Sequence, residues 1–172
     1  MSRRGPHDPL LDLAAVAAAL RAPKQPEDSF RALDQAMGRA IGHKLFTVLL
    51  HHEASGESER FYTNQPSHYP VGGRKPLNPT FWTQRVLREQ RPYIGREAAD
   101  IAAVFFDHVL IAKLGCASVI NLPVVFGGRT LGTINLLHEE AWYEEADLTL
   151  GAVFAGLAVP AYLAIADPES KI

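Results

Sequence analysis

Two segments near the start of the chain place apolar residues three or four positions apart, which is the spacing of one helix face. Residues 9–20 are mostly strong helix formers with leucine and alanine along one stripe, so they predict a first helix. A second helix is expected to begin near Asp28 and Ser29, which can cap it, and to end at Gly42. The apolar stripe of this second helix consists of Phe30, Leu33, Met37 and Ile41.

The pattern then changes to one typical of β-strands. Residues 45–50 are apolar and β-branched, and strand chemistry resumes at residues 60–63 after the turn residues 54–56. We expect these two strands to form an antiparallel pair. The next residues, 65–78, are rich in proline and glycine. A loop of this length in a compact domain is usually functional or disordered.

Two further helices are expected in the middle of the chain. Asn78 followed by Pro79 is typical of a helix start, and the helix should run to a stop before Pro92. A short extended piece at residues 93–95 separates it from a helix over residues 97–114, with Gly115 suited to the left-handed cap. One face of that helix carries Ile101, Val104, Phe105 and His108.

A strand hairpin follows directly. Residues 118–126 and 129–137 are both rich in strand formers, and only Gly127 and Gly128 separate them. Two glycines predict a two-residue hairpin turn, because both turn positions can require positive φ. Pro123 indicates either a bulge or a backbone position that faces away from a ladder partner.

The register of this hairpin decides which residues share a face. If Phe126 pairs with Arg129, a regular ladder places Asn121 opposite Ile134 and Asn135 opposite Ile120. The two asparagines then fall on different faces, so at most one of them should line a pocket. We favour Asn135 for the more polar face, which on this register is formed by Ser118, Ile120, Thr133 and Asn135.

The last element is a long apolar helix from about Glu144, in which Pro160 predicts a kink or a break in hydrogen bonding. The order of elements describes an α/β fold (α+β in detail), an α/β/α sandwich with a central, mostly antiparallel sheet and helices on both faces. We divide the chain into an N-terminal helix and linker (residues 1–27), a main domain (28–166) and a C-terminal tail (167–172).

Composition narrows the functional classes. The 172 residues carry a net charge of −2 with dispersed basic residues, which does not favour a nucleic-acid or membrane-surface binder. A single cysteine, Cys116, excludes an internal disulfide and agrees with a reducing, cytoplasmic location. Arg3 and Arg4 before the alanine-rich run imitate a signal peptide, but Asp12 interrupts that run. No apolar run reaches the roughly 18 uninterrupted residues of a membrane span.

The hairpin sequence resembles that of GAF domains. It reads S-V-I-N-L-P-V, then G-G-R, then L-G-T-I-N-L-L-H, and the later W-Y-E-E-A-D-L resembles the acidic entry to the C-terminal helix of that family. The resemblance covers about residues 28–166 and implies a stand-alone GAF domain. It indicates the fold better than the function, since GAF domains include cyclic-nucleotide, bilin, haem, amino-acid and redox sensors.

Three departures limit what the resemblance implies. The N-K-F-D-E pattern of cyclic-nucleotide members is absent. Bilin attachment needs a cysteine in a particular pocket context, whereas Cys116 stands at the entry to the hairpin. The free-methionine-sulfoxide reductases of this fold use more than one cysteine, and this chain has one.

By this resemblance, a small-ligand pocket lies between one sheet face and the inserted helices and loops. Tyrosines there can stack on a ligand or hydrogen-bond to it, although each is also an ordinary core aromatic. The 72–75 turn offers amides and two cations to an anion but lacks the context of a P-loop, so we expect a lid. The candidate ligand-binding residues are Tyr62, Asn64, Tyr69, Gly72, Gly73, Arg74, Tyr93, His108, Ser118, Thr133 and Asn135.

Three functions stay open. The first is a sensory module that binds a small molecule and signals through its outer helices as a homodimer, joined by the N- and C-terminal helices. The second is a redox or hydrolytic enzyme that uses Cys116 or His108, although a helix C-terminus before Cys116 would raise the pKa of the thiol. The third is a non-catalytic interaction subunit. We favour the first. The sequence names no cofactor, no catalytic residue and no metal site, and the histidines lack metal-ligand spacing.

Overall fold

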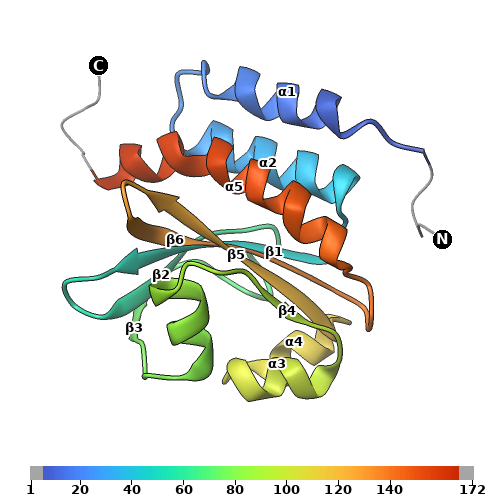
Figure 1. Ribbon diagram of the computed structural model, residues 1–172, viewed down its shortest axis with the longest axis vertical. Helices are drawn as coiled ribbons and strands as arrows, with labels where there is room; N and C mark the ends of the chain where they lie inside the picture. Colours follow the sequence, from blue (N-terminus) through green and yellow to red (C-terminus); the bar gives the residue numbers. More distant parts are fainter. Residues whose placement is uncertain (1–5, 167–172) are drawn as a thin grey trace.

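A computed structural model describes residues 6–166; the expected tail at 167–172 and Arg3 and Arg4 lie outside these residues. The chain forms one six-stranded antiparallel sheet with strand order β3-β2-β1-β6-β5-β4 (Figure 1). The strands are β1 (Leu45–His52), β2 (Glu57–Thr63), β3 (Arg74–Pro76), β4 (Tyr93–Gly95), β5 (Ser118–Phe126) and β6 (Arg129–His138). The helices are α1 (Pro9–Ala19), α2 (Glu27–Ala40), the π-helix η1 (Thr83–Arg88), α3 (Ala98–Val104), α4 (His108–Lys113) and α5 (Glu145–Ala166).

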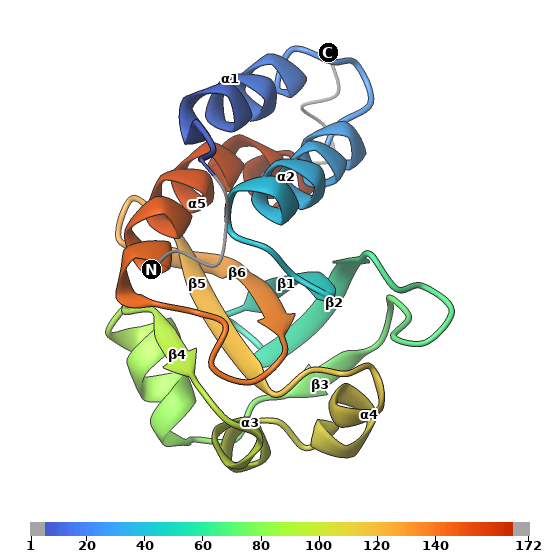
Figure 2. The same ribbon diagram turned by 90° about the vertical axis from the view of Figure 1, so that its right-hand side faces the viewer.

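Helices cover both faces of the sheet, which confirms the expected sandwich. Helices α2 and α5 lie on one face, with α1 outside them, while α3 and α4 lie on the other face (Figure 2). The main core joins α2 and α5 to the sheet through buried aromatic and aliphatic side chains such as Phe30, Phe46, Ile120 and Phe154. A second buried cluster under α3 and α4 includes Tyr69, Ile101, Val119 and Leu137.

The hairpin turn has the expected geometry, but its register differs from the prediction. Gly127 and Gly128 have φ of 59° and 77°, and Phe126 pairs with Arg129. The ladder then shifts, because Val125 pairs with Thr130 and Val124 with Gly132, so Leu131 is an extra residue in β6. Beyond this bulge Asn121 lies directly opposite Asn135. The prediction that the two asparagines face opposite sides of the sheet was therefore wrong.

Gly132 explains where the bulge falls. A Cβ built on this residue would come within 1.9 Å of the Leu49 carbonyl oxygen on β1. Only glycine permits β6 to approach β1 so closely, and glycine inside a strand often marks a bulge or a close backbone approach.

The single helix expected over residues 97–114 is broken into α3 and α4. Phe105 has φ of −110° and ψ of 124°, an extended conformation that ends α3. Asp107 stands at the N-terminal cap of α4 and turns the chain between the two short helices. The break brings Phe105, Phe106 and Asp107 together in the wall of one cavity, where a continuous helix would have carried only part of this segment.

Two other elements differ in detail. The helix expected at residue 78 begins later, because Thr80 and Thr83 exchange hydrogen bonds between backbone N–H and side-chain oxygen, as in an N-terminal capping arrangement. The proline- and glycine-rich loop contains β3, which pairs with Glu57, Ser58 and Glu59 at the edge of β2.

The final helix continues through Pro160 to Ala166. By length and composition alone, Glu145–Ile165 is apolar enough to cross a membrane, so the expectation that no segment is long enough was wrong. The core helix of a folded domain passes the same test, and α5 buries Phe154, Ala158 and Tyr162 in the main core. The Tyr162 hydroxyl also donates to the Thr133 carbonyl oxygen, which attaches the helix to β6.

Candidate functional site

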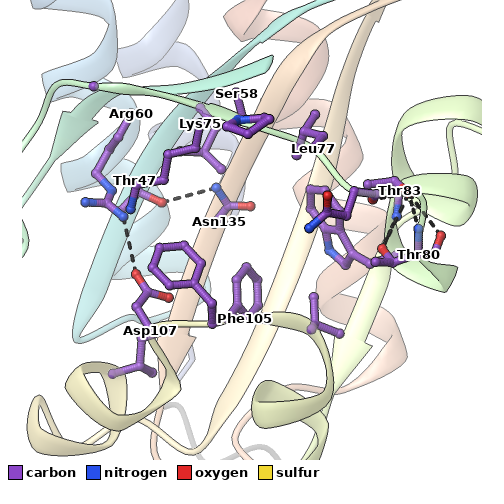
Figure 3. Close-up of a pocket in the computed structure, with 18 of the residues that line it drawn as sticks. Thr47, Ser58, Arg60, Lys75, Leu77, Thr80, Thr83, Phe105, Asp107 and Asn135 are labelled. Carbon is purple, nitrogen blue, oxygen red and sulfur yellow. Dashed lines mark hydrogen bonds and ion pairs between the residues drawn. The ribbon is translucent and has the colours of Figure 1, made fainter. Parts of the chain in front are cut away.

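A cavity of about 220 Å³ lies between the sheet and the elements on its α3/α4 side. Its walls come from β1, β2 and β6, from the 69–83 segment, and from the α3–α4 connection. Figure 3 shows side chains from these separate segments around one space. Sites for drug-sized ligands span roughly 300–1,000 Å³, so this cavity suits a smaller molecule.

A row of polar side chains crosses the sheet beneath the cavity. The register places Thr47 beside Asn135, and Asn135 beside Asn121, on three adjacent strands. Trp82 Nε1 donates to Asn121 Oδ1 at 2.9 Å, Asn121 Nδ2 donates to Asn135 Oδ1 at 2.6 Å, and Asn135 Nδ2 donates to Thr47 Oγ1 at 3.1 Å. All four side chains are buried, so each bond satisfies a group that has little access to water.

We call these three hydrogen bonds the relay, and Trp82 fixes their direction. An indole N–H can only donate, so the oxygen of Asn121 must face it and both amides are then oriented in series. The series ends at Thr47, whose oxygen accepts from Asn135. Among residues 6–166 no acceptor is found for the Thr47 hydroxyl proton. Thr47 therefore brings an unused donor to the cavity wall.

A charged corner closes one end of the cavity. Arg60 Nη2 lies 3.5 Å from Asp107 Oδ2, and the Arg60 guanidinium stacks 3.5 Å above the centre of the Tyr69 ring. Arg60 Nη1 also donates to the Pro70 carbonyl oxygen at 2.8 Å, whereas its Nε is buried without a hydrogen-bond partner. The Tyr69 hydroxyl donates to Asp107 Oδ2. Burial raises the pKa of Tyr69 well above its usual value, so the phenol remains a donor.

The mouth of the cavity is formed by the loop that carries β3. Gly72 and Gly73 have φ of 104° and 75°, which requires glycine, and both line the cavity. Lys75 shares a sheet face with Ser58, its partner on β2, and its Nζ lies 4.0 Å above the Phe106 ring. Arg60 and Lys75 both reach the end of the cavity where Asp107 and Thr47 lie (Figure 3).

Four of the residues proposed from the sequence line this cavity, namely Tyr69, Gly72, Gly73 and Asn135. Thr133 lies in a small neighbouring cavity with Trp82, and its Oγ1 is buried without a partner. Arg74 points elsewhere, since it pairs with Glu57 and Glu59 on the surface.

The other proposed residues lie outside the cavity. The Tyr62 hydroxyl donates to Asp34 on the α2 side of the sheet, and Asn64 bonds to the backbone of Lys44 and Phe46. The Ser118 hydroxyl donates to the Glu139 carbonyl oxygen, and the Tyr93 hydroxyl to that of Asp100. His108 is exposed on α4.

Sequence reasoning missed several residues of the cavity. The contact between Arg60 and Asp107 could not be predicted, because the spacing of residues 97–114 predicts one continuous helix, and the contact depends on the break in that helix. Thr47 carried a usable signal, since it is the single polar residue in the apolar run 45–50. The lining residues not proposed from the sequence include Thr47, Arg60, Lys75, Trp82, Phe105 and Asp107.

The family profile of the GAF domain matches residues 25–161, most of the chain. The chain belongs to the GAF family. No curated relative matches this GAF domain. Its fold is similar to the GAF domain of a phosphoenolpyruvate-protein phosphotransferase from Coxiella burnetii, with a TM-score of 0.74 and 17% identity over 92% of this chain and 95% of that one.

Two further solved structures have the same fold. Free methionine-R-sulfoxide reductase from Neisseria meningitidis, in complex with its substrate, gives a TM-score of 0.69 at 15% identity, covering 95% of this chain and 96% of that one. The chromophore-binding domain of a bacteriophytochrome from R. palustris gives 0.71 at 11% identity, covering 96% and 65%. At these identities the likeness shows the fold alone.

The single thiol of this GAF domain lies away from the cavity. Cys116 is 3% exposed and borders a groove between α3 and α4 that His108 also lines. Burial raises the pKa of the thiol to about 11, and the positive charge of Lys44 opposes only part of that shift. Within residues 6–166, no three His, Cys, Asp or Glu side chains gather in a way that could hold a metal ion.

Proposed function

We propose that this GAF domain is a sensory module that binds a small molecule in the cavity beneath the 69–80 segment. The observation that carries the proposal is the hydroxyl of Thr47, held as a free donor at the cavity wall by the relay from Trp82. A mostly apolar cavity with a few oriented polar groups is the usual form of a small-molecule site. Phe105 and Trp82 supply apolar walls, and Asn135 and Thr47 the oriented groups.

The proposal includes a homodimer that transmits the ligand signal through the outer helices. Helix α1 exposes Leu10 and Leu11 at 66% and 71%, and α5 exposes Val153 and Leu163 at 49% and 37%. No charged residue occurs in α5 between residues 148 and 165. Exposed apolar faces of this kind are typical of protein interfaces, and most homo-oligomers are two-fold dimers. We place the dimer in the cytoplasm, where unpaired Cys116 would stay reduced.

The thiol-redox alternative has less support. The thiolate is the reactive form of cysteine, and burial disfavours it at Cys116. Cys116 also does not line the cavity that holds the oriented polar groups.

A thermal-shift screen of small anionic, neutral and cationic metabolites tests the sensory proposal. We expect at least one compound to raise the Tm of the wild type by roughly 5–10 °C at about 100 times its Kd. Val104 lines the cavity, so Val104→Trp should fill it and abolish that shift. Val109, 58% exposed on α4 and outside the cavity, supplies the control Val109→Trp. A screen without any stabiliser, or stabilisers that act equally on Val104→Trp, would contradict the proposal.

A further inference from the structure

Two side chains that line the cavity carry hydrogen-bond donors without a partner among residues 6–166. The Thr47 hydroxyl has no acceptor among the described residues, and Arg60 Nε is buried without a partner. Asn135 Nδ2 uses one of its two N–H groups on Thr47. A buried donor that stays unpaired is costly, so an occupant rich in acceptor atoms is favoured over one rich in donors.

The charges of the lining residues also favour an occupant with acceptor atoms. Arg60 and Asp107 form an ion pair and cancel each other. Tyr69 adds no charge, because a phenol is neutral near pH 7 and burial raises the pKa of this one further. Lys75 has no carboxylate partner in the part of the chain that the structure describes, and its Nζ lies 4.0 Å above the Phe106 ring. The cavity therefore keeps one uncompensated positive charge at its mouth, which favours a negatively charged occupant.

The size and the walls limit the rest of the ligand. A volume of about 220 Å³ falls below the range for drug-sized ligands. The walls between the charged corner and η1 are apolar and aromatic, with Leu77, Trp82 and Phe105. A flat or aliphatic group of modest size would pack there.

We propose that the ligand is a small organic carboxylate, with its negative charge facing Lys75, an acceptor atom for Thr47, and an apolar group against Trp82 and Phe105. This inference rests on the sensory function proposed above and specifies its ligand class. It also gives the Gly72–Gly73 turn a role, because an open backbone beside Lys75 allows a carboxylate to approach the mouth.

Matched compounds of equal size and different charge test this ligand class. The probes are benzoate, benzamide and benzylamine; phenylacetate, phenylacetamide and phenethylamine; and hexanoate, hexanamide and hexylamine. Each is titrated into the full chain by calorimetry up to about 5 mM, where a ligand with millimolar Kd is mostly bound. We expect at least one carboxylate to bind at least about fivefold more tightly than its amide and amine, because an uncompensated cation would favour the anion.

Variants assign the binding to the named residues. Lys75→Met keeps the aliphatic stem over Phe106 and removes the charge, so carboxylate affinity should fall about fivefold while amide affinity stays unchanged. The neighbouring Arg74→Met is the matched control, because Arg74 does not line the cavity. Thr47→Val should weaken binding about fivefold, whereas Thr47→Ser, which keeps the hydroxyl, should not. Near-UV circular dichroism of each variant without ligand verifies the fold.

The outcomes separate this inference from the sensory function. Amides or amines that bind as tightly as the carboxylates would overturn the ligand class and leave the sensory function standing. Carboxylate binding that Lys75→Met does not weaken would also overturn it. If no probe binds, the ligand class is wrong, and the broader screen with Val104→Trp still decides whether the cavity binds any small molecule.

Discussion

The side-chain amide of Asn121 donates to Oδ1 of Asn135 across 2.6 Å, joining β5 to β6 on the cavity side of the sheet. Both side chains are almost fully buried. The bond exists because the bulge at Leu131 places the two residues directly opposite each other. It makes Trp82, on the inserted segment, part of one polar network with Thr47 on β1.

Replacing Asn121 should destabilise the fold. Asn121→Leu would leave Trp82 Nε1 and Asn135 Oδ1 buried without partners, at a cost of about 2–4 kcal/mol in the free energy of unfolding. Urea denaturation measures this loss. Asn78→Ala, on an exposed asparagine, is the control and should change stability by less than about 0.5 kcal/mol. An equally small change for Asn121→Leu would show that the relay contributes no stability.

The contact between Arg60 and Asp107 should couple strand β2 to the α3–α4 connection. The two side chains are 17% and 14% exposed, so a double-mutant cycle with Arg60→Met and Asp107→Asn should give a coupling energy of about 1–2 kcal/mol. The exposed pair Arg91–Glu89 serves as the comparison and should give less than about 0.5 kcal/mol. Equal coupling energies in the two cycles would show that the Arg60–Asp107 contact does not hold the charged corner of the cavity together.

The pH dependence of stability should carry a contribution from Cys116. Burial raises the pKa of the thiol from 9.0 to about 11, so the folded chain holds the thiol proton more tightly than the unfolded chain. The resulting stability is fully present below pH 9 and is lost as the pH rises from 9 to 11. Between pH 9 and pH 11 the free energy of unfolding of the wild type should fall by up to about 2 kcal/mol more than that of Cys116→Ala. Denaturation measured at several pH values in this range tests the difference. Parallel pH profiles of the two proteins would refute this expectation.

The proposed homodimer can be tested on α5. A glutamate at an apolar interface is strongly unfavourable, so Val153→Glu and Leu163→Glu should convert a dimer to a monomer in light scattering coupled to size-exclusion chromatography. Val109→Glu changes a valine on α4 that is 58% exposed, against 49% for Val153, and should leave the dimer intact. A wild-type monomer at high concentration, or dimers that survive both α5 substitutions, would remove the proposed route of signalling.

The fold could be predicted because its strongest signals are local. Gly127 and Gly128 specify their turn through positive φ, and the spacing of Phe30, Leu33 and Met37 specifies a helix face. The register beyond the turn could not be predicted by counting residues, because one extra residue at the bulge brings Asn121 and Asn135 onto the same face. Gly132 within the strand pattern was the one available sign of a bulge. The reason that a side chain is excluded there, the nearby Leu49 carbonyl oxygen, lies on another strand.

The candidate site was predicted only where its residues carry a local sequence signal. Tyr69, Gly72 and Gly73 belong to a loop whose composition alone indicates an unusual role. Arg60, Asp107 and Trp82 acquire their positions from contacts with residues far away in the sequence. The extended conformation of Phe105 decides where Asp107 lies, and the helical spacing of Ile101, Val104 and His108 does not predict that conformation.

Calorimetric titration of the best stabiliser from the screen into wild type and Val104→Trp decides whether this cavity is the ligand site. We expect saturable binding at one site per chain in the wild type, no measurable binding to Val104→Trp, and unchanged binding to Val109→Trp. Equal affinity for wild type and Val104→Trp would contradict the claim that this cavity is the ligand site.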